Sequence, residues 1–388
     1  MEARLWALVA LLALALATPL AVGADEDGED GADGGDPWTL EELRTRVAYM
    51  EQRGHGIQSQ ASRAGGPGRE RLRVFQPMGS FRLRHKHATH EVSLALDVVS
   101  SASADALDAI SHASRENEAG TIEITSAWDA TPDDHLSFTE GYHHEEPLAS
   151  GFFNLGYTRD LADDNATLGV SGGAIFDFFD PLTPSGFDPG FARRQTYTVN
   201  TSFSQILSPT TLFAATYGIT HQRGTLQTTW NSTPVIDDIH RAPEVFPRTR
   251  TRHALGARLL QMIEPSRTTF ELRYRYYRDD LGLEAHTGEL RVSQYIGPHI
   301  LAGTSYRLHH QDGISFYREA VPSGFDPELP LTSDSDLSTF WAHEVAWRLT
   351  FFLNSVEVGD AISMSYVHYT RSNDLDLDLA SIGWVRRY

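Results

Sequence analysis

In the second half of the chain, arginines occur in short runs in which every second residue is an arginine. Arg248, Arg250 and Arg252 show this spacing, and residues two apart lie on one face of an extended strand. Guanidinium groups gathered on one face bind anions or pair with carboxylates, and charged rings of this kind set the ion preference of a pore. The residues predicted to line an enclosed, charged interior are Arg248, Arg250, Arg252, Arg258, Glu271, Arg273, Arg275, Glu289, Arg291, Arg307, Glu344 and Arg348.

The inward positions predicted for the first half of the chain are acidic or small. They are Asp97, Glu123, Glu140 and Asn200. A basic wall that faces an acidic wall produces a transverse field, which favours small anions or dipolar solutes. The alternative is an interior whose arginines are all salt-bridged and through which nothing passes, because a buried arginine must be paired. The sequence leaves both interpretations open.

Histidines cluster in the stretch His85-Lys-His87-Ala-Thr-His90. This stretch falls at a predicted periplasmic turn, and imidazoles at such a spacing bind zinc or copper. His85, His87 and His90 are therefore candidate metal ligands, although a solvated turn explains the same residues. The stretch His143-His144-Glu145-Glu146 offers a similar choice at a predicted outer loop.

The composition excludes several classes of function. A net charge of −20 argues against a nucleic-acid partner, since phosphate binding needs clustered lysine and arginine. The chain has no cysteine, which removes disulfides and thiolate sites. Asp237, Asp238 and His240 can be grouped as a protease-like site, but they stand in a long polar stretch where such residues are expected anyway. We predict neither an enzyme nor a bound cofactor.

The first 43 residues are interpreted as export and leader segments. Arg4, the apolar run from Leu5 to Leu16 and the small residues before Ala24 describe a cleaved signal peptide over residues 1–24. Residues 25–43 begin with Asp, Glu and Gly, which predicts a disordered acidic leader. Thr39 and Glu42 have the spacing of a capping box, so a short helix is expected before a barrel domain over 44–388.

Beyond the leader the hydrophobic period is two. Phe270, Leu272 and Tyr274 alternate with Glu271 and Arg273, and similar segments of about 10 residues recur along the chain, as in transmembrane β-barrels. No stretch after the signal peptide approaches the roughly 18 apolar residues of a membrane helix. Only helices and closed barrels satisfy every backbone group within lipid. The predicted fold is therefore all-β, a transmembrane antiparallel barrel.

Short turns alternate with long loops along the chain. The short turns include 163–165, 208–209 and 264–266, and the long loops lie at about 180–192, 222–247 and 311–335. This order predicts short periplasmic turns, long outer loops and an even count of about 16 strands. The count falls to about 14 if the weakly patterned first pair, near 45–57 and 70–85, lies outside the wall.

The carboxyl terminus has the aromatic end of a barrel strand, but its phase is irregular. Leu375, Leu377 and Leu379 are out of step with Ile382 and Trp384. If every apolar residue of this strand faces lipid, a bulge or a late strand start is required.

Several stretches resemble a family of Gram-negative outer-membrane barrels that is known only as a domain of unknown function. The resemblance spans about residues 45–388 and implies a barrel fold without an agreed activity. Genes of this family often stand beside genes for a small lipoprotein, a thioredoxin-like protein and a flavin transferase, which implies envelope redox partners. The similar stretches are Asp97-Val-Val-Ser-Ser-Ala-Ser103, Phe246-Pro-Arg-Thr-Arg-Thr-Arg-His253, residues 274–290 and Asp336-Leu-Ser-Thr-Phe340.

The sequence thus predicts a barrel of the bacterial outer membrane, in contact with its lipid. Its expected function is that of a channel or pore for small solutes with an arginine-rich polar lumen. One alternative is a structural or docking barrel for periplasmic redox or lipoprotein partners. Another is an exported soluble β protein, such as a sandwich, because a single alternating strand fits either environment.

Overall fold

The computed structural model describes residues 38–54, 71–101, 118–145, 148–180, 182–183, 186–187, 191–227, 232–236, 241–354 and 359–388. The predicted signal peptide, the acidic leader up to residue 37 and the Asp237–His240 group lie outside these residues. The expected short helix is wrong, because Thr39 begins the first strand and Glu42 lies within it. The wall of the barrel therefore starts at residue 39 rather than 44.

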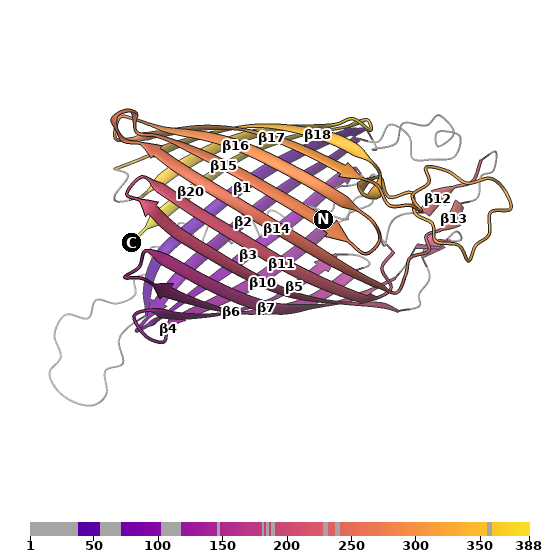
Figure 1. Ribbon diagram of the computed structural model, residues 1–388, viewed down its shortest axis with the longest axis horizontal. Coiled ribbons are helices and arrows are strands. Elements are labelled where there is room, and N and C mark those ends of the chain that lie inside the picture. Colours follow the sequence, from indigo (N-terminus) through magenta and orange to yellow (C-terminus); the bar gives the residue numbers. More distant parts are fainter. Residues whose placement is uncertain are drawn as a thin grey trace, which may run out of the picture.

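The described strands close into an antiparallel barrel of 16 wall strands, as predicted (Figure 1). The first strand pairs with both the second and the last, so the 14-strand alternative is wrong. Two short pairs, β8–β9 and β12–β13, lie in loops: Leu182–Thr183 with Gly186–Phe187, and Ser232–Pro234 with Arg241–Pro243. The wall strands are β1 Thr39–Gly54, β2 Arg71–His85, β3 Ala88–Ser101, β4 Glu118–Asp129, β5 Asp134–Glu145, β6 Leu148–Leu161, β7 Ala166–Phe179, β10 Ala192–Ser208, β11 Thr211–Gly224, β14 Thr249–Ile263, β15 Thr268–Asp279, β16 Glu284–Ile296, β17 Ile300–Asp312, β18 Phe340–Phe352, β19 Ala361–Arg371 and β20 Leu375–Arg387.

Short turns lie at one end of the barrel and the longest loops at the other, as the sequence predicted. We call these the turn end and the loop end (Figure 1, left and right). The turn end has the tight connections 86–87, 162–165 and 209–210, and Lys86 and Asp163 adopt positive φ there. The loop end has the connections 225–248 and 313–339. The two described helical turns, η2 Glu264–Ser266 and η3 Ser335–Leu337, are short, and no described helix is long and apolar enough to cross a membrane.

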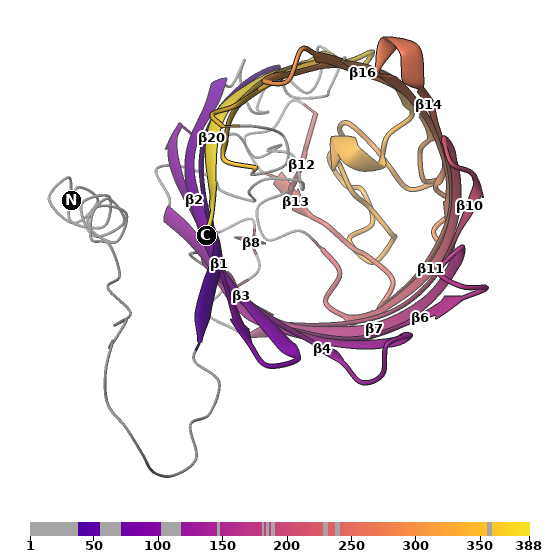
Figure 2. The same cartoon turned by 90° about the vertical axis from the view of Figure 1, so that its left-hand side faces the viewer.

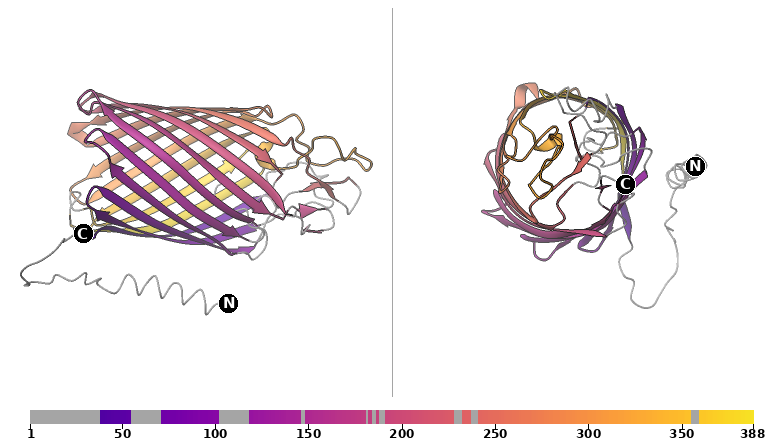
Figure 3. Two further views of the ribbon diagram at one scale, coloured as in Figure 1. Left: turned by 90° about the horizontal axis from the view of Figure 1, so that it is seen from below. Right: turned by 90° about the vertical axis from the view of Figure 1, so that its right-hand side faces the viewer.

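Large apolar side chains cover the outer face of the wall. Leu255, Leu272 and Leu290 remain 53%, 56% and 47% exposed in the isolated chain. Leu272 and Leu290 stand opposite each other in the ladder between β15 and β16. Exposed aliphatic side chains on so many strands are stable only against lipid. The soluble sandwich is excluded, because the strands form one closed and strongly tilted ring (Figure 3).

The last strand needs neither a bulge nor a late start. β20 pairs with β1 and β19 without a register shift, so odd and even positions keep opposite faces throughout. Leu375 and Leu377 face the interior, where Leu377 packs with Met50, Leu72 and Val74 in a buried cluster. The predicted bulge was wrong because the loop-end half of this strand turns its apolar side chains inward.

Candidate functional site

The strand register gathers charged side chains from a long stretch of sequence into rows across the inner face. In one row Arg258 stands opposite Arg273, Arg273 opposite Glu289, and Glu289 opposite Arg307. Arg307 in turn stands opposite Glu344 on β18. Directly opposed side chains on one face of a sheet lie within contact distance. Alternation positions each of these residues, because their sequence neighbours are the apolar residues of the outer face.

Glu271 is the centre of the densest charge cluster. Its carboxylate is buried and accepts a hydrogen bond from Arg258 Nε at 2.6 Å. Arg273 pairs with the same oxygen, and Arg291 lies 4.0 Å from the other one. Arg291 also donates to Glu289 at 2.8 Å. Three guanidinium groups thus share two carboxylates, and this part of the wall keeps an excess of positive charge.

Two further pairs lie nearer the loop end. Arg250 Nε donates to the buried Asp279 carboxylate at 2.8 Å. Arg307 and Glu344 are 3.5 Å apart, at the limit of a direct hydrogen bond. The loop-end half of the inner face is therefore ordered by ion pairs, which hold the side chains against the wall.

Some inward arginines have no carboxylate partner. Within the described part of the chain, Arg46, Arg275 and Arg348 form no ion pair. Arg46 instead donates from Nη2 to Ser381 Oγ at 2.9 Å. Arg348 has the like charges of Arg291 and Arg46 around it. A guanidinium group stays charged at any working pH, so these side chains give the interior a net positive character.

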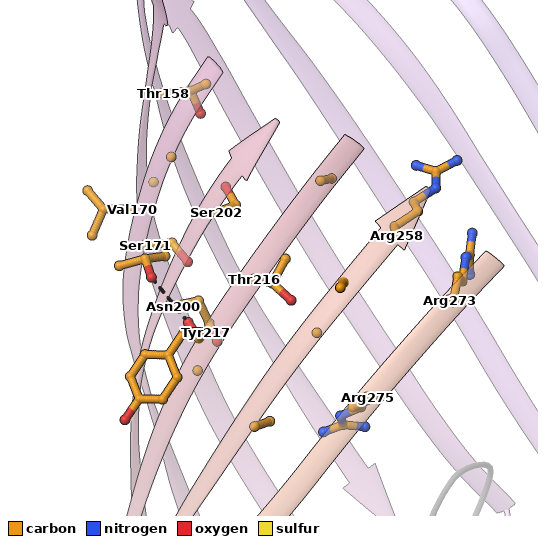
Figure 4. A pocket seen from close by; sticks show the side chains of 18 of the residues that line it. Thr158, Val170, Ser171, Asn200, Ser202, Thr216, Tyr217, Arg258, Arg273 and Arg275 are labelled. Atoms are coloured by element: carbon orange, nitrogen blue, oxygen red, sulfur yellow. Dashed lines mark hydrogen bonds between the residues drawn. The ribbon is translucent and has the colours of Figure 1, made fainter. Parts of the chain in front are cut away.

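Two cavities adjoin along the interior. The larger, of about 830 Å³, has Arg258 and Arg273 on one side and Asn200 among small hydroxyl residues on the other (Figure 4). The second, of about 470 Å³, lies toward the loop end beside Arg250 and Arg252. Both cavities are lined by Arg275, Thr287 and Arg307. A third, of about 350 Å³, lies beside Arg44, Arg46 and Glu123.

The loop over 313–339 covers part of the mouth of the barrel: seen along the barrel axis it lies within the ring (Figure 2), and in the side view part of it projects beyond the loop end (Figure 1). Ile314 and Leu337 of this loop pack in a buried cluster with Leu283 and Ala285. Arg371 of β19 binds Asp336 of the loop at 2.5 Å. These contacts tie the loop to the wall on two sides, so it narrows the path through the loop end.

The connection over 225–248 joins the same cap. Val245 forms a β-bridge with Leu331 of the other loop. Nearby, the buried Thr332 hydroxyl donates to the Glu244 carboxylate. The capping role of Asp336 and Arg371 was not predicted. The one sequence feature that could have drawn attention to Asp336 is its place in the stretch 336–340, which resembles the family.

Two of the sequence-predicted positions lie elsewhere than expected. Arg248 precedes β14 and is exposed at the loop end. Glu140 was predicted to face inward, but it stands opposite Ile124 and Phe153, which are exposed on the outer face. Glu140 therefore lies among lipid-facing side chains. Glu123 and Asn200 face the interior, and the Asp97 side chain is outside the described residues.

The three candidate metal ligands are not gathered into a site. His85 stacks on Trp38 at 4.8 Å between ring centroids, and His90 hydrogen-bonds Ser126 at 2.8 Å. His87 lies in the turn between β2 and β3. In the described ranges no group of three or more His, Asp or Glu side chains is arranged to hold a metal ion. The aromatic stacking on Trp38 explains the placement of His85 without a metal.

The stretch Gly169-Val-Ser-Gly-Gly173 has the Gly-x-Ser-x-Gly spacing of a hydrolase nucleophile elbow. In such enzymes the serine stands on a sharp turn between a strand and a helix. Here the stretch lies in the middle of β7, and Ser171 lines the large cavity. Close packing of the strands accounts for Gly173, since a Cβ there would lie 2.5 Å from the Phe153 carbonyl oxygen, and a Cβ at Gly169 would lie 2.5 Å from Ser202 Oγ.

Comparison with known proteins places the chain in a family. Residues 86–378 match the family described as protein of unknown function (DUF3570). The chain belongs to this family. No curated protein matches the sequence. The family resemblance and the barrel fold predicted from the sequence are thus confirmed.

Solved structures share the fold at low sequence identity. A bacterial polysaccharide outer membrane secretin has a TM-score of 0.50 and 8% identity, with 89% of this chain and 98% of that chain covered. OccK8 (OprE) of Pseudomonas aeruginosa gives 0.47 and 8%, covering 92% and 100%. A BenF-like porin from Pseudomonas fluorescens Pf-5 gives 0.45 and 8%, covering 90% and 99%. The closed ring of 16 strands and the likeness to the secretin together give the DUF3570 chain the fold of an outer-membrane β-barrel.

Proposed function

We propose that this barrel is a pore for small solutes, with a preference for anions. The observation that carries the proposal is the inner face itself, where Arg46, Arg275 and Arg348 have no carboxylate partner among the described residues. Uncompensated cations in a confined space of low dielectric attract anions and exclude cations. The proposal assigns no catalytic residue and no cofactor to the chain.

The adjoining cavities support a continuous path. Arg275 and Arg307 line both the 830 Å³ and the 470 Å³ cavity, so an anion can pass between the two while it stays near a guanidinium group. The neutral wall around Asn200 offers hydrogen bonds without competing charge. We propose that the barrel lies in the bacterial outer membrane and that the predicted signal peptide is cleaved near Ala24 during export.

The test is the current through single barrels in a planar lipid bilayer under a potassium chloride gradient. We expect discrete channel events and a reversal potential of the sign for anion selectivity. Charge removal in Arg275→Gln and Arg348→Gln is expected to move this potential toward zero, because each substitution removes an uncompensated cation. Thr287→Ser, beside Arg275 on the lining, is the matched control and leaves the potential unchanged. Absence of channel events in folded barrels, or cation selectivity, contradicts the proposal.

The cap at the loop end favours a second candidate function. Because the 313–339 loop fills part of the mouth, the barrel also suits a structural or docking role for a small lipoprotein or periplasmic redox partners. Such partners would meet the turn end, where the connections are short. Copurification of the intact barrel with envelope proteins, together with silent bilayers, would favour this role over a pore.

A further inference from the structure

The outer face of β10, β11, β14 and β15 differs in charge from the rest of the chain. β10, β11 and β14 contain no aspartate or glutamate. On β15, Glu271 and Asp279 both face the interior and bind arginines there. The outward face of these four strands therefore carries no carboxylate, in a chain whose net charge is −20.

Cations gather at the loop end of this same face. Arg193 of β10, Arg223 of β11 and Arg278 of β15 are all exposed. His221 and His253 lie on the same face of β11 and β14, where they hydrogen-bond Thr251 and Tyr217 at 3.1 and 2.8 Å. The register places His253 directly opposite Arg278. We call these three arginines and two histidines the cationic sector, whose charge comes from the arginines: Arg193, His221, Arg223, His253 and Arg278.

Two arginines of the cationic sector stack on aromatic rings. The Arg193 guanidinium lies 5.7 Å from the centre of the Phe178 ring, and that of Arg223 lies 5.5 Å from the Tyr197 ring. Arg223 Nε donates to the side chain of Gln195 at 2.6 Å. The ring contact orients the Arg193 guanidinium, and the ring contact together with the hydrogen bond orients that of Arg223. The described carboxylate nearest in register is Glu284 of β16, opposite Arg278, and it marks the edge of the sector.

We propose that the cationic sector binds a phosphate-bearing lipid of the outer leaflet. Below the sector the same strands present an apolar surface, with Val199 49% and Leu255 53% exposed. A ligand at this place meets cations near the loop end and apolar side chains nearer the middle of the barrel. That is the layout of an anionic headgroup attached to acyl chains. Phe191, 81% exposed at the rim, adds an apolar contact beside Arg193.

The cationic sector covers only one side of the barrel, whereas a feature that merely keeps the barrel in the membrane would be present around the whole ring. Across the barrel, the outward loop-end face of β19, β20 and β1 carries Asp378 beside Arg53 and His368. There the charges compensate one another, and an anionic headgroup gains little. We therefore expect a bound lipid at β10–β15 and not around the whole ring.

The test measures lipid binding to the folded barrel in detergent by native mass spectrometry. The probes are lipid A with two phosphates, the same lipid without phosphates, and inorganic phosphate. For Arg193→Gln combined with Arg223→Gln we expect the affinity for phosphorylated lipid A to fall on the order of 30-fold, about fivefold for each surface arginine that is removed. Heat-modifiable migration on a gel confirms that each variant is folded.

The matched control is Arg159→Gln combined with Arg386→Gln, which removes the same charge from the outward face at the turn end. This control should bind phosphorylated lipid A as the unmodified barrel does, and the lipid without phosphates should bind equally weakly to all three proteins. Equal loss in the control, or no loss in the Arg193/Arg223 variant, overturns the proposal. Displacement of the lipid by an equal concentration of inorganic phosphate overturns the assignment to a lipid.

Discussion

Leu272→Arg is expected to destabilise the folded barrel by about 2–4 kcal/mol, the cost of an arginine on the lipid face near the bilayer centre. Leu272 lies in the middle of β15, is 56% exposed in the isolated chain and stands opposite Leu259 and Leu290. Its side chain therefore faces acyl chains rather than water. The measurement is the free energy of unfolding from a urea titration of the barrel in lipid vesicles.

The control for this substitution is Thr216→Arg on the inner face of β11, which is two strands away from β15 in the wall. Thr216 lines the 830 Å³ cavity, so a new guanidinium there has room and water. We expect its unfolding free energy to fall by less than about 1 kcal/mol, as for an ordinary surface substitution. Equal destabilisation by the two arginines would contradict the assignment of faces.

Replacing the 313–339 loop with a short turn between Asp312 and Phe340 is expected to raise single-channel conductance severalfold. The loop lies in the mouth and contributes Asp334, Asp336 and Leu337 to the lining of the 470 Å³ cavity. Its removal widens the path at the loop end, and conductance rises with the cross-section that is open to ions. The measurement is the same planar-bilayer recording with symmetric salt.

A point variant gives the graded form of this result. Arg371→Met removes the ion pair with Asp336. The Arg371 guanidinium carbon lies 4.3 Å from the centre of the Phe340 ring, and the methionine side chain can still cover that ring. We expect noisier channels with brief openings to larger conductance, because one of the two anchors of the loop is lost. An unchanged conductance in the shortened barrel would show that the loop does not limit the path.

The barrel could be predicted from the sequence because its main determinant is local. A period of two decides which face a side chain occupies, and it alone assigns Arg258, Glu271 and Arg273 to the inner face. The count of 16 followed from the alternation of turns and loops. Glu140 was misplaced although Leu136, Phe138 and Tyr142 share its parity, and these neighbours already assign it to the outer face.

The cap and the inner apolar cluster could not be predicted in the same way. The contact of Asp336 with Arg371 joins residues 35 positions apart, and it depends on how a loop without a repeating pattern folds over the mouth. Leu377 faces inward, where it packs with Met50 and Leu72, and only the closure of the barrel brings β20 beside β1. Local periodicity contains no information about either contact.

The most direct test of the account uses the absence of cysteine from the chain. Single cysteines at Leu272 and at Thr287, on opposite faces of neighbouring strands, are exposed to a water-soluble maleimide in barrels folded into lipid vesicles. The account predicts rapid labelling of the Thr287→Cys protein and protection of the Leu272→Cys protein. Labelling of Leu272→Cys with protection of Thr287→Cys would mean that the charged face is dry and the apolar face wet. That result would contradict the assignment of the apolar face to lipid and of the charged face to the interior.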